Sequence, residues 1–526
     1  MQVLGEMLIG RESVRGGQAE MRALNPATNA SIAPMFGAGG TAEVDRACRL
    51  AAAAFDSYSR IAPQLRARFL DSIAENLEGL GDTLVTRCVA ETGLPPERVS
   101  GEIAWAAAQL RMFARVVLRG LWRNATIDSA EPSRQPLPRV DLRMQKVPLG
   151  PVVVFGASNF PILYSVAGGD TASALASGCP VVAKAHPSHL GTSELVGRAI
   201  QKAVADNGLH EGVFSLIIGD GNSIGEALVD HPETKAVAFT GSEAGGMALV
   251  RRGLMRAQPI PVFAEMTSSN PHFVLPTALA TRADTFATRF VEQMVASVGQ
   301  MCLTPGIILA IDGTGFNALR STLRETLADT PAATMLARNI HANFERGVER
   351  LRCSTGVTEL ACGADSGGAL DGRTHLFEVD AKAVLHDIHL LDEVFGPSAI
   401  LVRCQSADEM LAVGGAMRGQ LSMVVHLEPV DHELAHRLLP VVEAKTGRIV
   451  INAFSNMVEI SDAQVHGGPF PATSDPRFTA VGSTAIDRFL RPVAYQNFPP
   501  ELLPPALRDD NPLGLWRLRD NAPGNA

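Results

Sequence analysis

The pattern of apolar and polar positions over residues 41–120 is helical. Thr41 stands where an N-terminal helix cap is expected, and good helix formers crowd the stretch that follows it. Proline and glycine then divide the region, because both residues interrupt helices. The predicted helices cover residues 47–55, 64–80, 83–91 and 98–118.

From residue 151 onward the pattern changes to short β-branched runs separated by helical stretches. The runs lie at 152–155, 181–183, 214–218, 236–239 and 261–264, with helical stretches at 163–177, 192–206, 224–230 and 245–255. A second set of apolar runs follows at 272–275, 307–311, 399–402, 423–426 and 448–451. Apolar strands that alternate with helices indicate parallel βαβ units buried on both faces. The predicted fold class is therefore α/β, with two successive open parallel sheets.

Two segments depart from this pattern. Residues 128–147 are polar and proline-rich, and their alternating run predicts a projecting, half-exposed pair of strands. The tail, 484–526, alternates apolar and polar positions before it becomes rich in proline. We expect an edge strand there, followed by an arm that joins subunits.

Composition narrows the class of protein. The chain has 526 residues, 46% of them hydrophobic, which rules out wholesale disorder and suffices for several domains. A formal net charge of −9 gives no support for general nucleic-acid binding. Seven cysteines without tight spacing form no disulfide scaffold and argue against structural zinc. Because no apolar run reaches the length of a membrane span and the first ten residues lack a signal-peptide pattern, we expect a cytoplasmic enzyme.

Several polar residues fall at strand ends or in turns, where open α/β sheets bind ligands. Lys184 and Glu265 each close a predicted strand, while Asn159 and Cys302 lie in turns rich in small residues. A carboxylate there can act as a general base, an amide can stabilise an oxyanion, and a presented thiol can act as a nucleophile. Each residue also has an ordinary explanation, since strand-end lysines are commonly solvated and most cysteines are buried and inert.

Two glycine-rich turns are candidates for binding a phosphate. The turn 219–225 has one residue too many between its second and third glycines for a dinucleotide fingerprint, so a simple helix-opening turn is the better interpretation. The turn 239–246 follows a predicted strand and precedes a predicted helix, where backbone N–H groups can face a phosphate. A strand-to-helix turn that needs positive φ explains the same glycines equally well.

Taken together, six short motifs resemble the aldehyde dehydrogenase superfamily in their order and spacing, over residues 24–499. They are Phe155-Gly-Ala-Ser-Asn-Phe-Pro161, Val182-Ala-Lys184, Phe239-Thr-Gly-Ser242, Glu265-Met-Thr267, Gly299-Gln-Met-Cys302 and Glu393-Val-Phe-Gly-Pro397. The stretches that begin at Ser158, Val166, Lys184 and His466 look most like the α-ketoglutaric semialdehyde (2,5-dioxovalerate) dehydrogenases. The NADP-linked long-chain aldehyde dehydrogenases of luminous bacteria share much of this pattern.

The resemblance implies an aldehyde dehydrogenase-like fold, with two open parallel α/β (Rossmann-like) domains and a small β oligomerisation arm. A dinucleotide-binding domain would take residues 1–127 and 148–267, and a catalytic domain with the nucleophilic cysteine would take 268–483. Residues 128–147 and 484–526 would form the bridging segments of a homodimer or homotetramer. The implied partner is a small-molecule aldehyde, with no metal, no nucleic acid and no membrane span.

The resemblance also assigns roles in catalysis. Cys302 would attack the aldehyde carbonyl, and the Asn159 amide with the Cys302 backbone N–H would hold the oxyanion. Glu265 would then activate water to release the acid from a thioester.

For the cofactor, the resemblance places Lys184 at the adenosine ribose, and Ser242 with Gly241 in its loop at the pyrophosphate. Glu393 would hold the nicotinamide ribose, with Phe395 packed nearby.

The sequence departs from the family pattern at two positions that bear on function. Pro187 stands where many NAD-linked members carry Glu, so NADP is the expected cofactor, with NAD also used. Leu303 replaces the common Thr, which alters the shape of the aldehyde pocket.

The predicted function is NAD(P)-dependent oxidation of 2,5-dioxopentanoate to 2-oxoglutarate. One alternative is an NADP-dependent long-chain fatty aldehyde dehydrogenase. An alternative of another class is a catalytically retired structural or binding protein of the same fold, against which the intact Cys302, Glu265 and Asn159 weigh. A CoA-dependent acylating reaction is disfavoured, because a water-activating base competes with thiol attack on the thioester.

Overall fold

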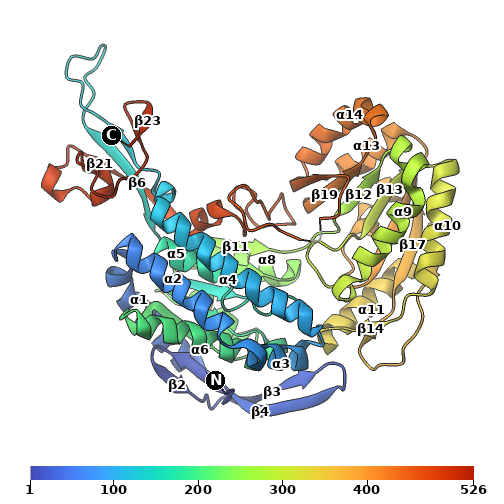
Figure 1. Ribbon diagram of the computed structural model, residues 1–526, viewed down its shortest axis with the longest axis horizontal. Coiled ribbons are helices and arrows are strands. Elements are labelled where there is room, and N and C mark those ends of the chain that lie inside the picture. The colour runs from blue at the N-terminus through green and yellow to red at the C-terminus, as the bar shows by residue number, and fades with distance from the viewer. Residues whose placement is uncertain (1, 456, 526) are drawn as a thin grey trace.

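The computed structural model describes residues 2–455 and 457–525 (Figure 1). Its first large sheet has the strand order β11-β10-β7-β8-β9-β1-β2. The parallel strands are β7 (Val152–Phe155), β8 (Val181–Lys184), β9 (Phe214–Ile217), β10 (Ala236–Thr240) and β11 (Val262–Glu265). They match the predicted runs to within one residue at each end, because strands buried on both faces carry an unbroken apolar signal.

Two N-terminal strands extend this sheet beyond the predicted set. β1 (Met7–Ile9) pairs antiparallel with β9, and β2 (Glu12–Val14) pairs antiparallel with β1. Three residues are too few to show a period, so the sequence pattern did not indicate them.

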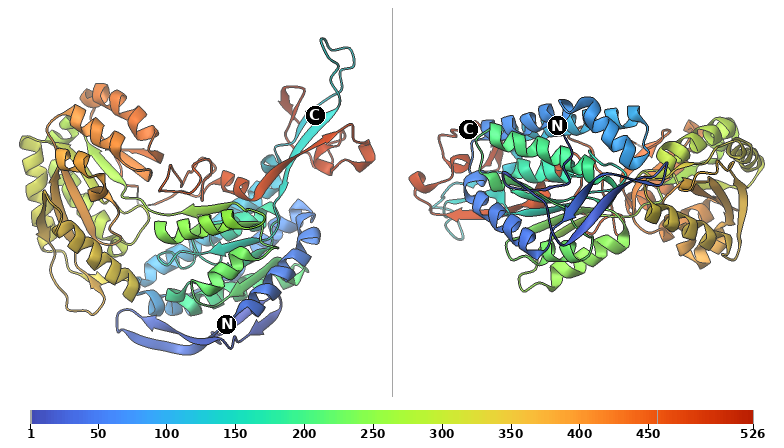
Figure 2. Two further views of the ribbon diagram at one scale, coloured as in Figure 1. Left: turned by 180° about the vertical axis from the view of Figure 1, so that it is seen from behind. Right: turned by 90° about the horizontal axis from the view of Figure 1, so that it is seen from below.

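Helices cover both faces of this sheet, as Figures 1 and 2 show. They are α1 (Thr41–Ser59), α2 (Pro63–Glu78), α3 (Gly81–Thr92), α4 (Pro96–Arg119), α5 (Gly169–Ser177), α6 (Leu190–Asp206), α7 (Ser223–Asp230) and α8 (Glu243–Met255).

The predicted helix over 163–177 begins only at Gly169, where α5 starts. The backbone N–H groups of Ile162 and Leu163 donate to a carboxylate oxygen of Glu102, at 2.7 and 2.8 Å, instead of entering a helix. A buried carboxylate of α4 therefore fixes the turn that follows Asn159.

The second large sheet has the order β15-β17-β18-β13-β12-β19-β20. Its strands are β12 (Pro271–Val274), β13 (Ile307–Ile311), β15 (Val357–Cys362), β17 (His375–Asp380), β18 (Ser398–Cys404), β19 (Gln420–His426) and β20 (Thr446–Ile451). All pair in parallel except β15, which runs antiparallel to β17. The helices that pack on it are α9 (Pro276–Val295), α10 (Thr314–Ala328), α11 (Arg338–Arg352), α12 (Ala381–His386), α13 (Ala407–Ala416) and α14 (His432–Glu443).

A third sheet projects from the body as an arm, at the upper left of Figure 1. Its order is β21-β6-β5-β22-β23, with β5 (Thr126–Asp128), β6 (Leu142–Pro148), β21 (Leu490–Gln496), β22 (Arg517–Arg519) and β23 (Ala522–Gly524). The polar segment 128–147 and the tail 484–526 therefore share one sheet.

Two small two-stranded sheets complete the described strands: β3 (Ala19–Asn25) pairs with β4 (Ala30–Ala38), and β14 (Ala333–Thr334) pairs with β16 (Asp371–Gly372).

The two large sheets belong to two lobes with separate hydrophobic cores (Figure 2). The α/β class and the two successive sheets are confirmed, while the exact domain boundaries stay a prediction. After β20 the chain returns over β11 before it enters the arm (Figure 1). Among the residues that the structure describes, no helix is long and apolar enough to cross a membrane.

Candidate active site

Cys302 lies in a bend that the backbone reaches through three residues in the left-handed region. Ser297, Val298 and Gly299 have φ values of 51°, 57° and 65°. A Cβ atom on Gly299 would lie 2.3 Å from the carbonyl carbon of Gly396. Only glycine permits this approach. The loop that carries the thiol is therefore packed directly against the loop of Glu393 and Phe395.

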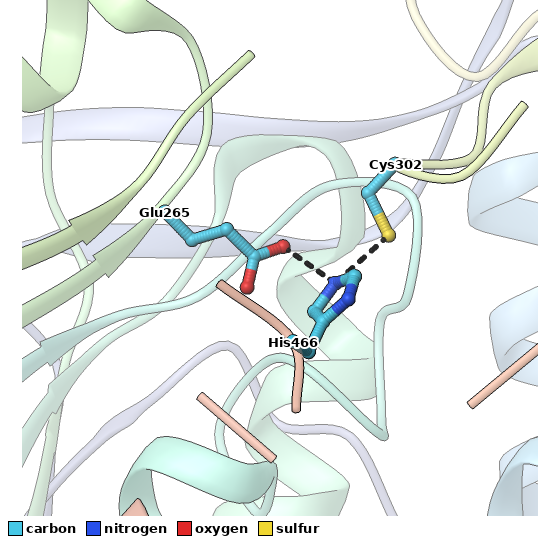
Figure 3. Close-up of side chains that lie close together, drawn as sticks. All are labelled: Glu265, Cys302 and His466. Atoms are coloured by element: carbon cyan, nitrogen blue, oxygen red, sulfur yellow. Dashed lines mark hydrogen bonds and ion pairs between the residues drawn. The ribbon is translucent and has the colours of Figure 1, made fainter. Parts of the chain in front are cut away.

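The thiol of Cys302 faces His466 and Glu265, as Figure 3 shows. Cys302 Sγ lies 3.4 Å from His466 Nε2, and the same nitrogen lies 2.9 Å from Glu265 Oε1. Cys302 is partly exposed, whereas the side chains of Glu265 and His466 are buried. A single imidazole nitrogen thus stands between the sulfur and the carboxylate, so a proton on Nε2 can be shared with either.

The electrostatics of His466 follow from these two neighbours. Burial disfavours the imidazolium, but the nearby Glu265 carboxylate and Cys302 thiol outweigh it and raise the pKa of His466 well above its usual value. A protonated His466 would stabilise a thiolate on Cys302. Glu265 Oε2 is buried without a protein hydrogen-bond partner in the described structure, which leaves an acceptor free for another group.

The atoms of Glu265, Cys302 and His466 that could bind a metal lie within 4.8 Å of one another. Two hydrogen-bonding contacts to Nε2, at 2.9 and 3.4 Å, account for this closeness without an ion.

Two asparagines fix the segment around the thiol. Asn159 Nδ2 donates to the carbonyl oxygen of Gln300 at 3.0 Å, two residues before Cys302. Asn270 Nδ2 donates to the carbonyl oxygens of Cys302 and Thr304, at 2.8 and 3.0 Å. One amide hydrogen of Asn159 remains beyond its bond to Gln300.

Glu393 lies close to the carboxyl end of β11. Its Oε2 accepts from Thr267 Oγ1 at 2.5 Å. Burial raises the pKa of Glu393 to about 7, against the opposing effect of the hydrogen bonds from Thr267 and the Ser268 backbone. Glu393 and Phe395 line one pocket together with Gly299 and Thr304, so the structure brings these predicted cofactor residues to the thiol loop.

The other predicted cofactor residues lie on the first sheet. Lys184 ends β8, and burial lowers its pKa to about 8, which the charge of Asp220 partly offsets. Ser242 caps α8 by accepting from the Gly245 backbone N–H at 3.2 Å. The Gly241 N–H donates to the Glu265 carbonyl oxygen at 3.1 Å, which ties this turn to β11. The helix predicted over 245–255 starts at Glu243, so the turn opens directly into α8.

These features fit a dinucleotide. A capped helix start with a preceding glycine can receive a pyrophosphate, and a buried carboxylate can accept from a ribose hydroxyl. They lie at the carboxyl ends of parallel strands, where open sheets bind ligands.

Sequence reasoning gave His466 no role. It lies 164 positions after Cys302, and its own spacing carries no catalytic signature. The stretch that begins at His466 did contribute to the resemblance. The signal that could have marked His466 is an ionisable residue in a glycine-rich segment.

Comparisons with known proteins bear on the family and the fold of this chain. The model of the aldehyde dehydrogenase family matches residues 14–469. An alpha-ketoglutaric semialdehyde dehydrogenase 2 from Azospirillum brasilense is 52% identical over 99% of both chains. An alpha-ketoglutaric semialdehyde dehydrogenase from Acinetobacter baylyi is 41% identical over 98% of both chains.

Two solved structures are similar in fold. Lactaldehyde dehydrogenase from Escherichia coli has a TM-score of 0.81 at 19% identity, over 93% of this chain and 98% of that one. Aldehyde dehydrogenase C from Pseudomonas syringae, a mutant solved with NAD+ and octanal, has a TM-score of 0.80 at 20% identity, over 95% and 98%.

Proposed function

The chain belongs to the aldehyde dehydrogenase family, and from that premise we propose that it oxidises 2,5-dioxopentanoate to 2-oxoglutarate, with NADP accepted as well as NAD. The contact of Cys302 Sγ with His466 Nε2, itself bonded to Glu265, is the observation that carries the chemistry. The two whole-length relatives, both semialdehyde dehydrogenases by name, support the substrate.

Cys302 is the nucleophile in this proposal. Its thiol proton passes to His466 Nε2, and the sulfur attacks the aldehyde carbon to give a thiohemiacetal. The imidazolium stays beside the Glu265 carboxylate at 2.9 Å, which favours the transfer. His466 therefore holds the proton that makes the sulfur reactive.

The oxygen of the thiohemiacetal gains negative charge and needs donors. The free amide hydrogen of Asn159 and the Cys302 backbone N–H supply them, and one such donor is worth about 10²–10³ in kcat. The bond from Asn159 Nδ2 to the Gln300 carbonyl oxygen fixes the amide in place, so no reorganisation is required.

The nicotinamide, when bound, accepts the hydride that leaves the former aldehyde carbon. Glu393 and Phe395 would hold its ribose side, and Lys184, Gly241 and Ser242 would hold the adenosine and pyrophosphate. A thioester remains on Cys302.

Glu265 completes the cycle. Water positioned at its unpartnered Oε2 would lose a proton to the carboxylate and attack the thioester carbon. The acid leaves and Cys302 is regenerated as a thiolate beside His466.

Pro187 supports the use of NADP. It follows β8 and begins the short turn Pro187–His189, three positions after Lys184. No carboxylate stands at this position to repel a 2′-phosphate, and the Lys184 ammonium lies at the end of the adjacent strand.

We also propose that the chain forms a homodimer or homotetramer. β21 ends the arm sheet and β20 ends the second large sheet, so both present unpaired backbone groups. Ile449 and Ile451 on β20 are 37% and 45% exposed, which is costly for an edge strand in water. If β21 of a second copy paired with β20, the backbone groups of both edge strands would be hydrogen-bonded and Ile449 and Ile451 would be covered.

Steady-state kinetics with purified protein test the substrate. We expect formation of NADPH with 2,5-dioxopentanoate at a kcat/KM well above that with long-chain aldehydes such as octanal or tetradecanal. A higher kcat/KM for the long-chain aldehydes would contradict the proposed substrate and favour the fatty aldehyde alternative.

A further inference from the structure

Arg448 lies on β20, the edge strand of the second sheet. Its side chain projects to the same face of the sheet as a series of hydrogen-bonded polar groups that begins at Cys302. It pairs in register with Ser422 of β19, and paired residues on neighbouring strands project to the same face. Ser422 Oγ lies 3.3 Å from Asn270 Oδ1, and Asn270 donates to the Cys302 carbonyl oxygen at 2.8 Å. One polar network therefore connects the strand position of Arg448 with the thiol loop.

The guanidinium of Arg448 is anchored to the segment that returns towards the site. Its Nη1 donates to the carbonyl oxygens of Ser455 and Met457, at 3.2 and 2.7 Å. The next residue, Val458, packs in a small apolar cluster with Leu303, Leu421, Ala472 and Val481, which Tyr164 and Cys302 also contact. Arg448 thus anchors the segment that leads into this apolar cluster.

Tyr164 links Arg448 with the catalytic group. Its ring stacks on the imidazole of His466, with centroids 6.1 Å apart. Its hydroxyl has no hydrogen bond within the described structure, although the ring is largely covered. Burial lowers the pKa of Arg448, and the nearby Tyr164 acts in the opposite direction.

Other arginines near the site are neutralised by carboxylates. Arg98 pairs with Glu102 at 2.7 Å, and Arg488 pairs with Asp170 at 2.7 Å. Arg418 pairs with Glu243 and Asp392, at 2.6 and 3.3 Å. In residues 2–455 and 457–525, Arg448 forms no ion pair with a carboxylate, and its guanidinium donates to carbonyl oxygens. Its positive charge is therefore available to an anion.

We propose that Arg448 binds the carboxylate at the far end of the oxo-acid substrate and that the Tyr164 hydroxyl donates to the same end of the molecule. This inference rests on the proposed function, because only an aldehyde with an acidic tail needs the cation. A planar guanidinium suits a carboxylate, since its N–H groups match the two oxygens. The Leu303 and Val458 walls would then contact the methylene groups between the carboxylate and the aldehyde.

Paired substrates separate this role from a structural one. Arg448→Met should lower kcat/KM for 2,5-dioxopentanoate about 100-fold, mainly through KM, because a hydrogen-bonded charge pair is lost. The same variant should change kcat/KM for pentanal, the neutral aldehyde of equal carbon length, by less than about 3-fold. Arg448→Lys should recover part of the loss. Arg324→Met, on the exposed face of α10, is the matched control that removes a charge elsewhere.

Two results with the paired aldehydes would overturn the role of Arg448. Equal losses with both aldehydes would mean that Arg448 only supports the 455–459 loop, and unchanged use of the acid would also overturn the inference. A wild-type enzyme that oxidises pentanal but not the acid would overturn the proposed substrate and, with it, the inference. If Arg448→Met does not fold, the inhibition constant of 2-oxoglutarate against pentanal oxidation tests the same role. Inhibition should be about 10-fold weaker in Arg448→Lys than in wild type, and equal inhibition would overturn the inference.

Discussion

The imidazole of His466 lies 3.4 Å from the sulfur of Cys302, through the same nitrogen that contacts Glu265 at 2.9 Å. The thiol of Cys302 and the carboxylate of Glu265 are therefore not independent, because one proton on Nε2 lies between them. Thiol activation and water activation would alternate around this nitrogen in each turnover.

Replacement of His466 by Asn should make the thiol less reactive at neutral pH. The neighbouring groups raise the pKa of His466, which favours the imidazolium form and stabilises a thiolate on Cys302. Alkylation of Cys302 by iodoacetamide at pH 7 should slow by about 10-fold or more, and kcat/KM should fall by about 10²-fold. The pH profile of alkylation is the decisive measurement. A profile identical to that of wild type would exclude His466 from thiol activation.

Glu265→Gln should separate the two halves of the reaction. The isosteric amide keeps a partner for His466 but cannot take a proton from water. We expect one rapid equivalent of NADPH followed by turnover slowed by about 10²–10⁴-fold, observed by stopped-flow absorbance. Loss of the rapid phase as well would place Glu265 before hydride transfer.

Cofactor binding should weaken in mildly acidic solution. Burial raises the pKa of Glu393 to about 7, so the carboxylate is ionised above pH 7 and accepts from a ribose hydroxyl, whereas below pH 7 it becomes protonated. The KM for NADP should rise as the pH falls from 8 to 6. In Glu393→Gln this rise should disappear, and a KM that keeps its pH dependence in the variant would exclude Glu393 as its source.

The ratio of activity with NADP to that with NAD should respond to the residue at position 187. Pro187→Glu places a carboxylate near the 2′-position and should lower the NADP to NAD ratio of kcat/KM by about 10-fold or more. Pro187→Gln removes the proline without adding charge and is the matched control. An equal change in both variants would attribute the effect to the backbone of the 187–189 turn.

Gly299→Ala should displace the nucleophile loop. Its φ of +65° already strains any other residue, and the added Cβ would lie 2.3 Å from the Gly396 carbonyl carbon. Gly208→Ala is the matched control, because its φ of +63° is nearly the same and no atom lies within 4 Å of its Cβ. Both variants should lower the melting temperature, but only Gly299→Ala should lower kcat by more than about 10-fold. Equal kcat values in the two variants would mean that contact with Gly396 does not position Cys302.

The parallel strands could be predicted well from the sequence because a strand buried on both faces consists of consecutive apolar residues. β7 and β13 begin and end at the predicted residues. Strands of two or three residues, such as β1 and β14, carry no period and were missed. The helix predicted over 163–177 was too long, since a carboxylate 60 positions earlier, on Glu102, takes the N–H groups that would begin it.

The site was predicted unevenly for a related reason. Glu265 and Lys184 could be placed because strand ends meet at one edge of a parallel sheet. His466 could not, because its position depends on how the chain after β20 returns over β11, a tertiary contact that has no local signature. Arg448 lies on a predicted strand, but its contacts with Ser455 and Met457 depend on the same return.

The central claim is that oxidation proceeds through a thioester on Cys302. Intact-protein mass spectrometry of Glu265→Gln, after mixing with 2,5-dioxopentanoate and NADP, tests it most directly. We predict one equivalent of NADPH together with a mass increase of one acyl group, which peptide mapping places on Cys302 and which Cys302→Ala abolishes. Formation of NADPH while Cys302 stays unmodified would contradict the account.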